Sequence, residues 1–207
     1  MSPADPGPRR PARRMSPEAR RDHLVDTALE LYQRLQPEDV AVEDVTGAAE
    51  VSRALFYRYF PNVDALHVAA LGTVVDELVS RVALPADGSL AEQLAVAVEA
   101  FLDVAQQHAR AYVALLRSGS VISTGETDAL VDGVRDHIVA LLVERGGVPD
   151  PSPWQLMTLR GWVALVEGAT LTWLRDAGTG IGRDELRDWL VAQLFGLLEV
   201  TARRDPA

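Results

Sequence analysis

The strongest indication of the fold lies in residues 42–66, VEDVTGAAEVSRALFYRYFPNVDAL. Two short helices fit this stretch, over residues 42–49 and 52–57, and Pro61 ends the second. Four of the five residues from 56 to 60 are aromatic, and two arginines stand beside them. A buried cluster explains the two phenylalanines, but it leaves the arginines and the tyrosine hydroxyls without a role. We therefore expect a charged partner at this surface.

Helical signals continue on both sides of this stretch. Ser16 followed by Pro17 is typical of a helix start, and Pro37 is predicted to end that first helix. Asn62 is predicted to cap a long helix that runs to about Leu84. Further helices are expected over residues 89–109, 110–118, 127–145, 154–176 and 183–203. Because no alternating β-branched run predicts a strand, we expect an all-α fold of about nine helices.

Two short helices joined by a tight turn are the elements of a helix-turn-helix, whose second helix lies in the major groove of DNA. Arg53, at the start of that helix, could read guanine through a bidentate contact. Phe56 and Phe60 are expected to be core, whereas the tyrosines would lie near phosphate oxygens. An ordinary aromatic core with solvated arginines stays open on composition alone. The residues expected to contact DNA are Ser52, Arg53, Ala54, Leu55, Tyr57, Arg58 and Tyr59.

The order of the residues in this stretch resembles the DNA-binding signature of the tetracycline-repressor-like (TetR) family of bacterial regulators. The resemblance covers residues 18–78, including DTALELY in the first helix. It implies a homodimer with an N-terminal helix-turn-helix and a variable helical ligand domain. It further implies a repressor that an unknown small apolar or amphipathic effector releases from a palindromic operator in double-stranded DNA. The matching positions are Val42, Asp44, Val45, Ala48, Ala49, Val51, Ser52, Arg53, Phe56, Tyr57, Tyr59, Phe60 and Leu66.

We expect three parts along the chain. Residues 1–15 read as a flexible, arginine-rich arm, because they lack periodicity and are rich in proline. Residues 16–80 form the expected DNA-binding domain, with the helix-turn-helix motif at about 41–60. Residues 81–207 form the expected ligand-binding and dimerisation domain, where GWVALVEGATLTWLRD is similar to the penultimate helix of many family members.

Four positions depart from the family pattern. Ala41 stands where threonine or serine usually caps the second helix, and Glu43 stands where a basic residue is common. Glu50 replaces the turn glycine, at a cost of about 1 kcal/mol if its backbone is left-handed. Val63 replaces a lysine that is often a phosphate partner. These replacements favour an alternative from another class, a helical small-molecule or partner-binding protein with a weakened DNA-binding head.

The net charge of -10 is unevenly distributed. Residues 1–60 hold 9 arginines and 10 acids, net -1, whereas residues 61–207 hold 11 arginines and 20 acids, net -9. Six of the first nine arginines lie between Arg9 and Arg21, and the chain has no lysine. Because the electrostatic footprint of DNA binding is local, an acidic body with a basic head is compatible with it. The arginine arm could follow the DNA backbone or enter a minor groove.

The last two predicted helices are apolar on two sides, and such a helix must bury both. The economical solution packs one side into its own subunit and the other against a second copy, as the family resemblance also implies. A large monomeric core is the alternative. The residues expected at the dimer interface are Gly161, Ala164, Gly168, Trp189, Ala192 and Gly196.

A ligand pocket is expected among the fourth to eighth helices. Aromatic or polar residues within these apolar helices are its candidates, although plain core packing would explain each of them. A carboxylate inside an apolar helix needs a partner or a wet cavity, so Glu167 is expected to pair with an arginine, cap the dimer interface or meet a cationic ligand. The candidate pocket residues are Phe101, Tyr112, Leu116, Trp162 and Glu167.

Other kinds of chemistry find no support in the sequence. The absence of cysteine excludes disulfides and thiolate metal sites, and the four scattered histidines lack metal-ligand spacing, so we expect no metal. No phosphate-binding loop, nucleophile elbow or cofactor motif occurs, so we expect neither an enzyme nor a cofactor. The chain has no secretory signal and no run of about 18 apolar residues, so we expect a cytoplasmic protein without membrane association.

Overall fold

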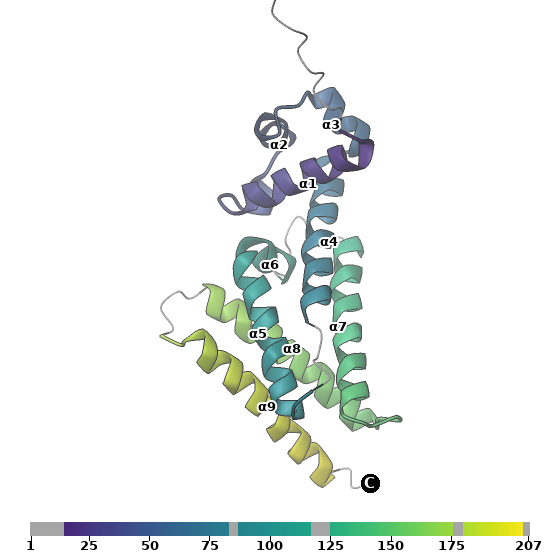
Figure 1. Cartoon of the computed structure of the whole chain (residues 1–207), viewed down its shortest axis with the longest axis vertical. Helices are drawn as coiled ribbons and strands as arrows, with labels where there is room; N and C mark the ends of the chain where they lie inside the picture. The colour runs from purple at the N-terminus through teal and green to yellow at the C-terminus, as the bar shows by residue number, and fades with distance from the viewer. Residues whose placement is uncertain (1–14, 83–86, 117–124, 176–179, 205–207) are drawn as a thin grey trace, which may run out of the picture.

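The computed structural model describes residues 15–82, 87–116, 125–175 and 180–204 (Figure 1). These ranges contain nine α-helices, one short 3-10 helix and no strand, which confirms the predicted fold class. The elements are α1 (Pro17–Tyr32), η1 (Pro37–Asp39), α2 (Val42–Ala48), α3 (Arg53–Tyr59), α4 (Val63–Arg81), α5 (Leu90–Gln107), α6 (Ala109–Leu116), α7 (Gly125–Arg145), α8 (Pro153–Arg175) and α9 (Arg183–Arg204). The predicted arm over residues 1–15 lies, apart from Met15, outside the described residues.

Helices α1, α2, α3 and the first half of α4 form the head, residues 17–71, at one end of the molecule (Figure 1). Phe56 of α3 is fully buried at its centre, among Leu24 of α1 and Val45 of α2. Phe60 is also buried, with its ring centroid 5.9 Å from that of Phe56. The packing places both phenylalanines in the core, as expected, and it fixes the short helix α3 against its neighbours.

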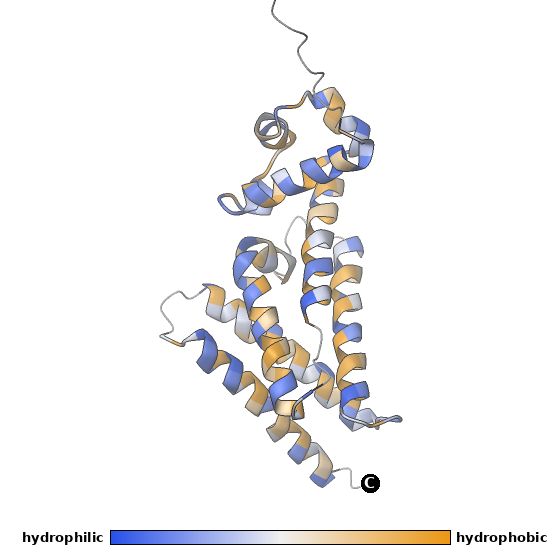
Figure 2. Cartoon of the chain, in the orientation of Figure 1, coloured by the Kyte–Doolittle hydropathy of each residue, from blue (hydrophilic) through white to orange (hydrophobic). Residues whose placement is uncertain are grey.

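The second half of α4 and helices α5 to α9 form the body, residues 72–204. Helix α9 packs against α5 and α8, while α7 packs against α4 and α8. Leu94, Leu102, Leu190 and Leu194 are buried between these helices. Figure 2 shows hydrophobic and hydrophilic residues alternating along α7 and α9, as expected for helices that have one face in a core.

Two helices connect the head and the body. Leu66 and Leu71 of α4 belong to the core of the head, whereas Leu78 of the same helix packs against the core of the body. Helix α6 lies between two helices of the body in the sequence, yet its buried Ala111 and Ala114 pack into the core of the head. The head therefore rests on the body through shared apolar packing.

The sequence analysis missed η1 and placed the end of the first helix too late. Helix α1 ends at Tyr32, and Pro37 begins the 3-10 turn instead of ending the helix. Proline is well suited to a first helical position because its missing N–H is not needed there. None of the helices in the described ranges combines the length and apolarity needed to cross a bilayer.

Candidate DNA-binding surface and ligand cavity

Helix α3, the second helix of the helix-turn-helix and its expected recognition helix, packs against the head on one side and faces solvent on the other. The Ser52 hydroxyl caps it, accepting a hydrogen bond from the backbone N–H of Leu55 at 3.2 Å. Five of the seven predicted DNA contacts are exposed, and the side chain of Tyr57 keeps about half its surface in solvent. The other two, Leu55 and Tyr59, are half-buried, and Tyr59 packs against the core of the head. The exposed set is Ser52, Arg53, Ala54, Tyr57 and Arg58.

The turn between α2 and α3 contains the one non-glycine residue with positive φ among the described residues. Glu50 has φ +52°, in the left-handed region that glycine adopts without cost. The predicted strain of about 1 kcal/mol therefore applies. The turn is held by the N–H of Val51, which donates to the carbonyl of Thr46 at 3.0 Å.

Helix α2 begins without a capping side chain, because Ala41 has none to offer. Asp44 makes one of the two hydrogen bonds of a capping box, because its carboxylate accepts a hydrogen bond from the N–H of Ala41 at 2.9 Å. The acidic first turn of α2, Glu43 and Asp44, also complements the positive end of the helix dipole.

The guanidinium of Arg53 is ion-paired with the carboxylate of Glu43. Both side chains are about 60% exposed, so their pairing contributes little to the stability of the fold. Its importance lies in the position of the two groups, because Glu43 on α2 occupies Nη2, one of the donors with which Arg53 would contact a base. In the sequence, Glu43 was noted only as an acid at a position where a basic residue is common, and its pair with Arg53 was not anticipated.

A second cation at this end of the molecule was also missed. The guanidinium of Arg21 on α1 lies over the ring of Phe60, 5.1 Å from its centroid. Arg21 itself is exposed, so its charge stands beside the C-terminal end of α3. Six arginines in the first 21 residues indicated a basic region, but the contact with Phe60 joins residues 39 positions apart and has no local signal.

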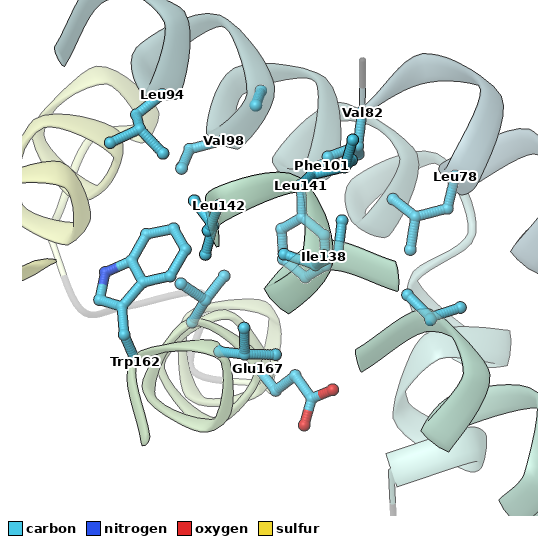
Figure 3. A pocket seen from close by; sticks show the side chains of 14 residues that line it. Leu78, Val82, Leu94, Val98, Phe101, Ile138, Leu141, Leu142, Trp162 and Glu167 are labelled. Atoms are coloured by element: carbon cyan, nitrogen blue, oxygen red, sulfur yellow. The ribbon is translucent and has the colours of Figure 1, made fainter. Parts of the chain in front are cut away.

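All five predicted pocket residues line at least one of two adjoining cavities in the body, which we call the lower and upper chambers. Figure 3 shows the lower chamber. The lower chamber, of about 60 Å³, includes Trp162 in its lining. The upper chamber, also about 60 Å³, includes Tyr112 and Leu116. Phe101 and Glu167 line both, and Phe101 lies near the centre of the view in Figure 3.

The polar groups around the chambers already have protein partners. The indole N–H of Trp162 donates to the carbonyl of Leu190 at 2.8 Å, and the Tyr112 hydroxyl donates to the backbone carbonyl of Glu167 at 3.2 Å. Burial raises the pKa of the Tyr112 hydroxyl well above its usual range, so that it stays protonated.

Glu167 pairs with an arginine, one of the three outcomes expected for it. Its carboxylate accepts from Nε of Arg135 at 3.0 and 3.2 Å and from Nη2 at 2.8 Å. These hydrogen bonds raise the pKa of Arg135, and a further ion pair joins Arg135 to Asp132 at 3.0 Å. The bidentate geometry explains how a carboxylate can line apolar chambers.

The cavities lie among the fourth to eighth helices, as expected, but no residue of α4 or α7 was named as a candidate. Leu78 and Val134 line both chambers, and Val74 and Val82 extend the wall along α4. The spacing of Val74, Leu78 and Val82 marks one face of a helix, but the same spacing is equally typical of a filled core. Only the packing of α4 against α5 and α7 shows which apolar side chains border an empty space.

The six residues predicted at a dimer interface are all exposed on α8 and α9. A methyl group added at Gly161, Gly168 or Gly196 would meet no heavy atom within 4 Å, so these positions leave room for a close partner. Large apolar side chains surround them, and two grooves of about 560 and 530 Å³ follow the same helices. The exposed apolar residues of α8 and α9 include Trp154, Met157, Trp189, Phe195, Leu197 and Val200.

No group of three His, Cys, Asp or Glu side chains within the described ranges has the geometry to hold a metal ion. In addition to the ion pairs already described, a group of ion pairs links α4, α5 and α9. In this group, Arg183 of α9 contacts Glu99 at 2.7 Å and Asp103 at 3.2 Å.

Both the N-terminal and the C-terminal part of the chain match known protein families. The family described as "Bacterial regulatory proteins, tetR family" matches residues 24–70, and that described as "Tetracyclin repressor-like, C-terminal domain" matches residues 90–197. A solved tetR-family transcriptional regulator from Streptomyces coelicolor is 34% identical, with a TM-score of 0.86 over 92% of this chain and 85% of that one.

More distant structures share the fold. A putative transcriptional regulator from Pseudomonas aeruginosa PAO1 is 24% identical, with a TM-score of 0.71 over 92% of this chain and 95% of that one. A transcriptional regulator from Rhodococcus sp. Rha1 is 19% identical, with a TM-score of 0.72 over 87% of this chain and 96% of that one.

Proposed function

Because this chain belongs to the TetR family of bacterial transcriptional regulators, we propose that it is a homodimeric repressor that a small-molecule effector releases from a palindromic operator. Residues 16–80 would serve as the DNA-binding domain and residues 81–207 as the ligand-binding and dimerisation domain. The observation that carries DNA binding is the recognition helix α3, which is anchored by Phe56 and presents Arg53, Tyr57 and Arg58 to solvent.

The exposed side chains of α3 suit two kinds of contact with DNA, one with base edges and one with phosphates. Arg53 near its start would read a base edge, because a guanidinium can donate two hydrogen bonds to guanine. The Tyr57 hydroxyl and the Arg58 and Arg21 guanidinium groups would contact phosphate oxygens, which position the helix without reading sequence. Operators lie on the chromosome, so this role places the protein in the cytoplasm.

The apolar surface of α8 and α9 supports a dimer. Trp189 is 45% exposed and Met157 is 63% exposed, and a monomer would leave both in water. Pairing α8 and α9 with their copies would bury these side chains in a four-helix interface. The two-fold axis would then present two recognition helices to half-sites about one helical turn apart.

The head and the body are coupled through α4 and α6. On α6, Tyr112 lines the upper chamber, while its neighbours Ala111 and Ala114 pack in the core of the head. The C-terminal end of α1 is also tied to the corner between α5 and α6, since the Gln33 amide donates to the carbonyl of Gln107 at 3.2 Å and Arg110 donates to the carbonyl of Gln33. A ligand that moves α6 would therefore move the head.

Release from DNA requires the effector to distinguish two arrangements of the head. We expect the free dimer to hold its recognition helices at the operator spacing and the bound effector, small and apolar or amphipathic, to favour another spacing. To reverse occupancy, its affinities for the two arrangements must differ by about 5 kcal/mol.

The ion pair between Arg53 and Glu43 favours a second candidate, a partner-binding or ligand-binding helical protein with a weakened head. Salt separates the two candidates, because a protein that neutralises several phosphates loses DNA affinity steeply as salt rises. A shallow salt dependence would favour the second candidate.

Selection of the purified full chain against a random double-stranded DNA library at moderate salt tests the proposal. Enrichment of a palindrome would support a sequence-reading dimer and supply its operator. Failure to enrich any sequence, with the protein folded and dimeric, would contradict it.

A further inference from the structure

Among the described residues, every polar side chain that lines the two chambers already has a partner within the protein. Glu167 is the one charged residue that the described part of the chain contributes to either lining, and its carboxylate accepts three hydrogen bonds from Arg135. The N–H of Trp162 and the hydroxyl of Tyr112 donate to backbone carbonyls. A charged group placed inside would therefore lose its hydration without gaining a partner.

The charge at the wall also disfavours ions of either sign. An anionic head group would approach the Glu167 carboxylate, while a cationic one would have to displace Arg135 from a bidentate contact at 2.8 to 3.2 Å. In Figure 3 the Glu167 carboxylate points away from Trp162, toward the edge of the lower chamber. Small apolar cavities of this kind stay dry and accept apolar guests.

The shape of the space is elongated. Leu94 lines the lower chamber and Ala105 the upper one, and these residues of α5 are separated by about 16 Å along the helix axis. Each chamber alone, at about 60 Å³, is far smaller than an ordinary ligand pocket. A ligand of more than a few atoms must therefore extend through both chambers.

Phe101 is the one aromatic residue among the four described residues that line both chambers. Its ring packs edge-on against Tyr112 with the centroids 5.8 Å apart and the planes at 78°. Its side chain is half-buried, and Val134 and Leu78 border the same two spaces. A turn of the Phe101 ring would merge the chambers and press on Tyr112, which belongs to the helix that supports the head.

We infer that the effector is an uncharged, elongated and largely hydrocarbon molecule that occupies both chambers once Phe101 turns aside. This inference rests on the proposed ligand-controlled function of the body. It excludes effectors whose charged group must be buried.

Three probes with the same eight-carbon chain test the charge: 1-octanol, octanoate and octylammonium. Each is titrated into the full-length protein without DNA, and binding is followed by calorimetry. We expect 1-octanol to bind at least tenfold more tightly than either ion. Equal affinities, a preference for an ion or no binding of 1-octanol would overturn the inference.

Three variants test the location. Val134→Phe should fill the wall shared by both chambers and weaken 1-octanol binding at least tenfold, whereas Phe101→Ala should strengthen it. Val96→Phe is the matched control, because Val96 is an exposed valine on α5 that lines neither chamber. Circular dichroism and size-exclusion chromatography check that each variant is folded. A folded Val134→Phe protein that binds 1-octanol like the control would place the ligand elsewhere and overturn the inference.

The DNA selection described above separates this inference from the function on which it rests. Enrichment of a palindrome together with preference for a charged probe would overturn the ligand class alone. Preference for 1-octanol without any enriched DNA would overturn the repressor function while supporting the chemistry of the chambers.

Discussion

Glu43 on α2 holds the guanidinium of Arg53 on α3 in an ion pair at the exposed end of the head. The residue with the greatest capacity to read a base is thus paired with an acid from the helix beside it. DNA must either break this pair or accommodate it, and each possibility has a different experimental outcome.

Glu43→Gln should tighten binding to the selected operator by about three- to tenfold. The change replaces the ion pair of Arg53 with at most a neutral hydrogen bond and removes a negative charge near the phosphates, and an exposed pair contributes at most about 1 kcal/mol. Fluorescence anisotropy with labelled operator measures the affinity. Glu144→Gln, at an exposed position on α7 of the body, is the control for net charge. Weaker binding by Glu43→Gln would instead show that Glu43 positions Arg53 for contact with a base.

Arg53→Ala should reduce base discrimination, whereas Tyr57→Phe should weaken binding evenly across sequences. A bidentate arginine–guanine contact discriminates by about 1–3 kcal/mol, while a phosphate contact carries no sequence information. Affinities of both variants are measured on the selected operator and on its single-base changes. Equal losses of selectivity in both variants would refute this division of roles.

Glu50→Gly should stabilise the protein by about 0.5–1 kcal/mol. The left-handed backbone at φ +52° strains any residue with a Cβ, although the gain is reduced by the extra freedom of glycine in the unfolded chain. Urea unfolding measures the difference. Glu50→Ala removes the same charge but keeps the strain, so equal stabilisation by both substitutions would attribute the effect to charge.

Acidification below about pH 6.5 should destabilise the head through His67. This side chain is buried and hydrogen-bonded to the Tyr32 hydroxyl, and burial lowers the pKa of His67 in spite of the opposing charges of Asp64 and Glu38. As the pH falls, His67 therefore takes up a proton in the unfolded chain before it does so in the folded protein. The stabilising contribution of neutral His67 is complete above its pKa in the unfolded chain and is lost as the pH falls toward its pKa in the folded protein.

Urea unfolding between pH 8 and pH 5 measures this effect in the wild type and in His67→Gln, which can still accept a hydrogen bond. We expect the wild type to lose more stability than the variant over that range. Parallel curves would assign the pH dependence to other groups.

Trp189→Glu should dissociate the proposed dimer, because it places a charge in the apolar surface of α8 and α9. Analytical ultracentrifugation measures the mass of the particle. Val96→Glu, at an equally exposed apolar position on α5, should leave the mass unchanged. An unchanged dimer in Trp189→Glu would place the interface on another surface.

The helices could be predicted because their signals are local. Ser16 and Asn62 were identified as caps from the sequence, and each side chain accepts the hydrogen bond expected of a cap. The left-handed turn at Glu50 could be anticipated because the resemblance pointed to a glycine there.

Pairings between distant residues could not be predicted. Arg135 is 32 residues from Glu167, and nothing in the sequence distinguishes it from the other arginines as the partner. The same holds for Arg53 with Glu43 and for Arg21 with Phe60, since each contact depends on how separate helices are packed. The two chambers are spaces that the packed side chains leave unfilled, and no sequence pattern predicts where such spaces occur.

The sharing of α4 between the two cores restricts how this protein can be recombined with its relatives. A chimera that takes its head from one regulator and its body from another must be joined inside α4, between Leu71, the last residue of that helix in the core of the head, and Val74, the first that lines a chamber of the body. A junction outside that span would divide one of the two cores between unrelated sequences. Because Ala111 and Ala114 of α6 also enter the core of the head, the graft must carry those two positions with it.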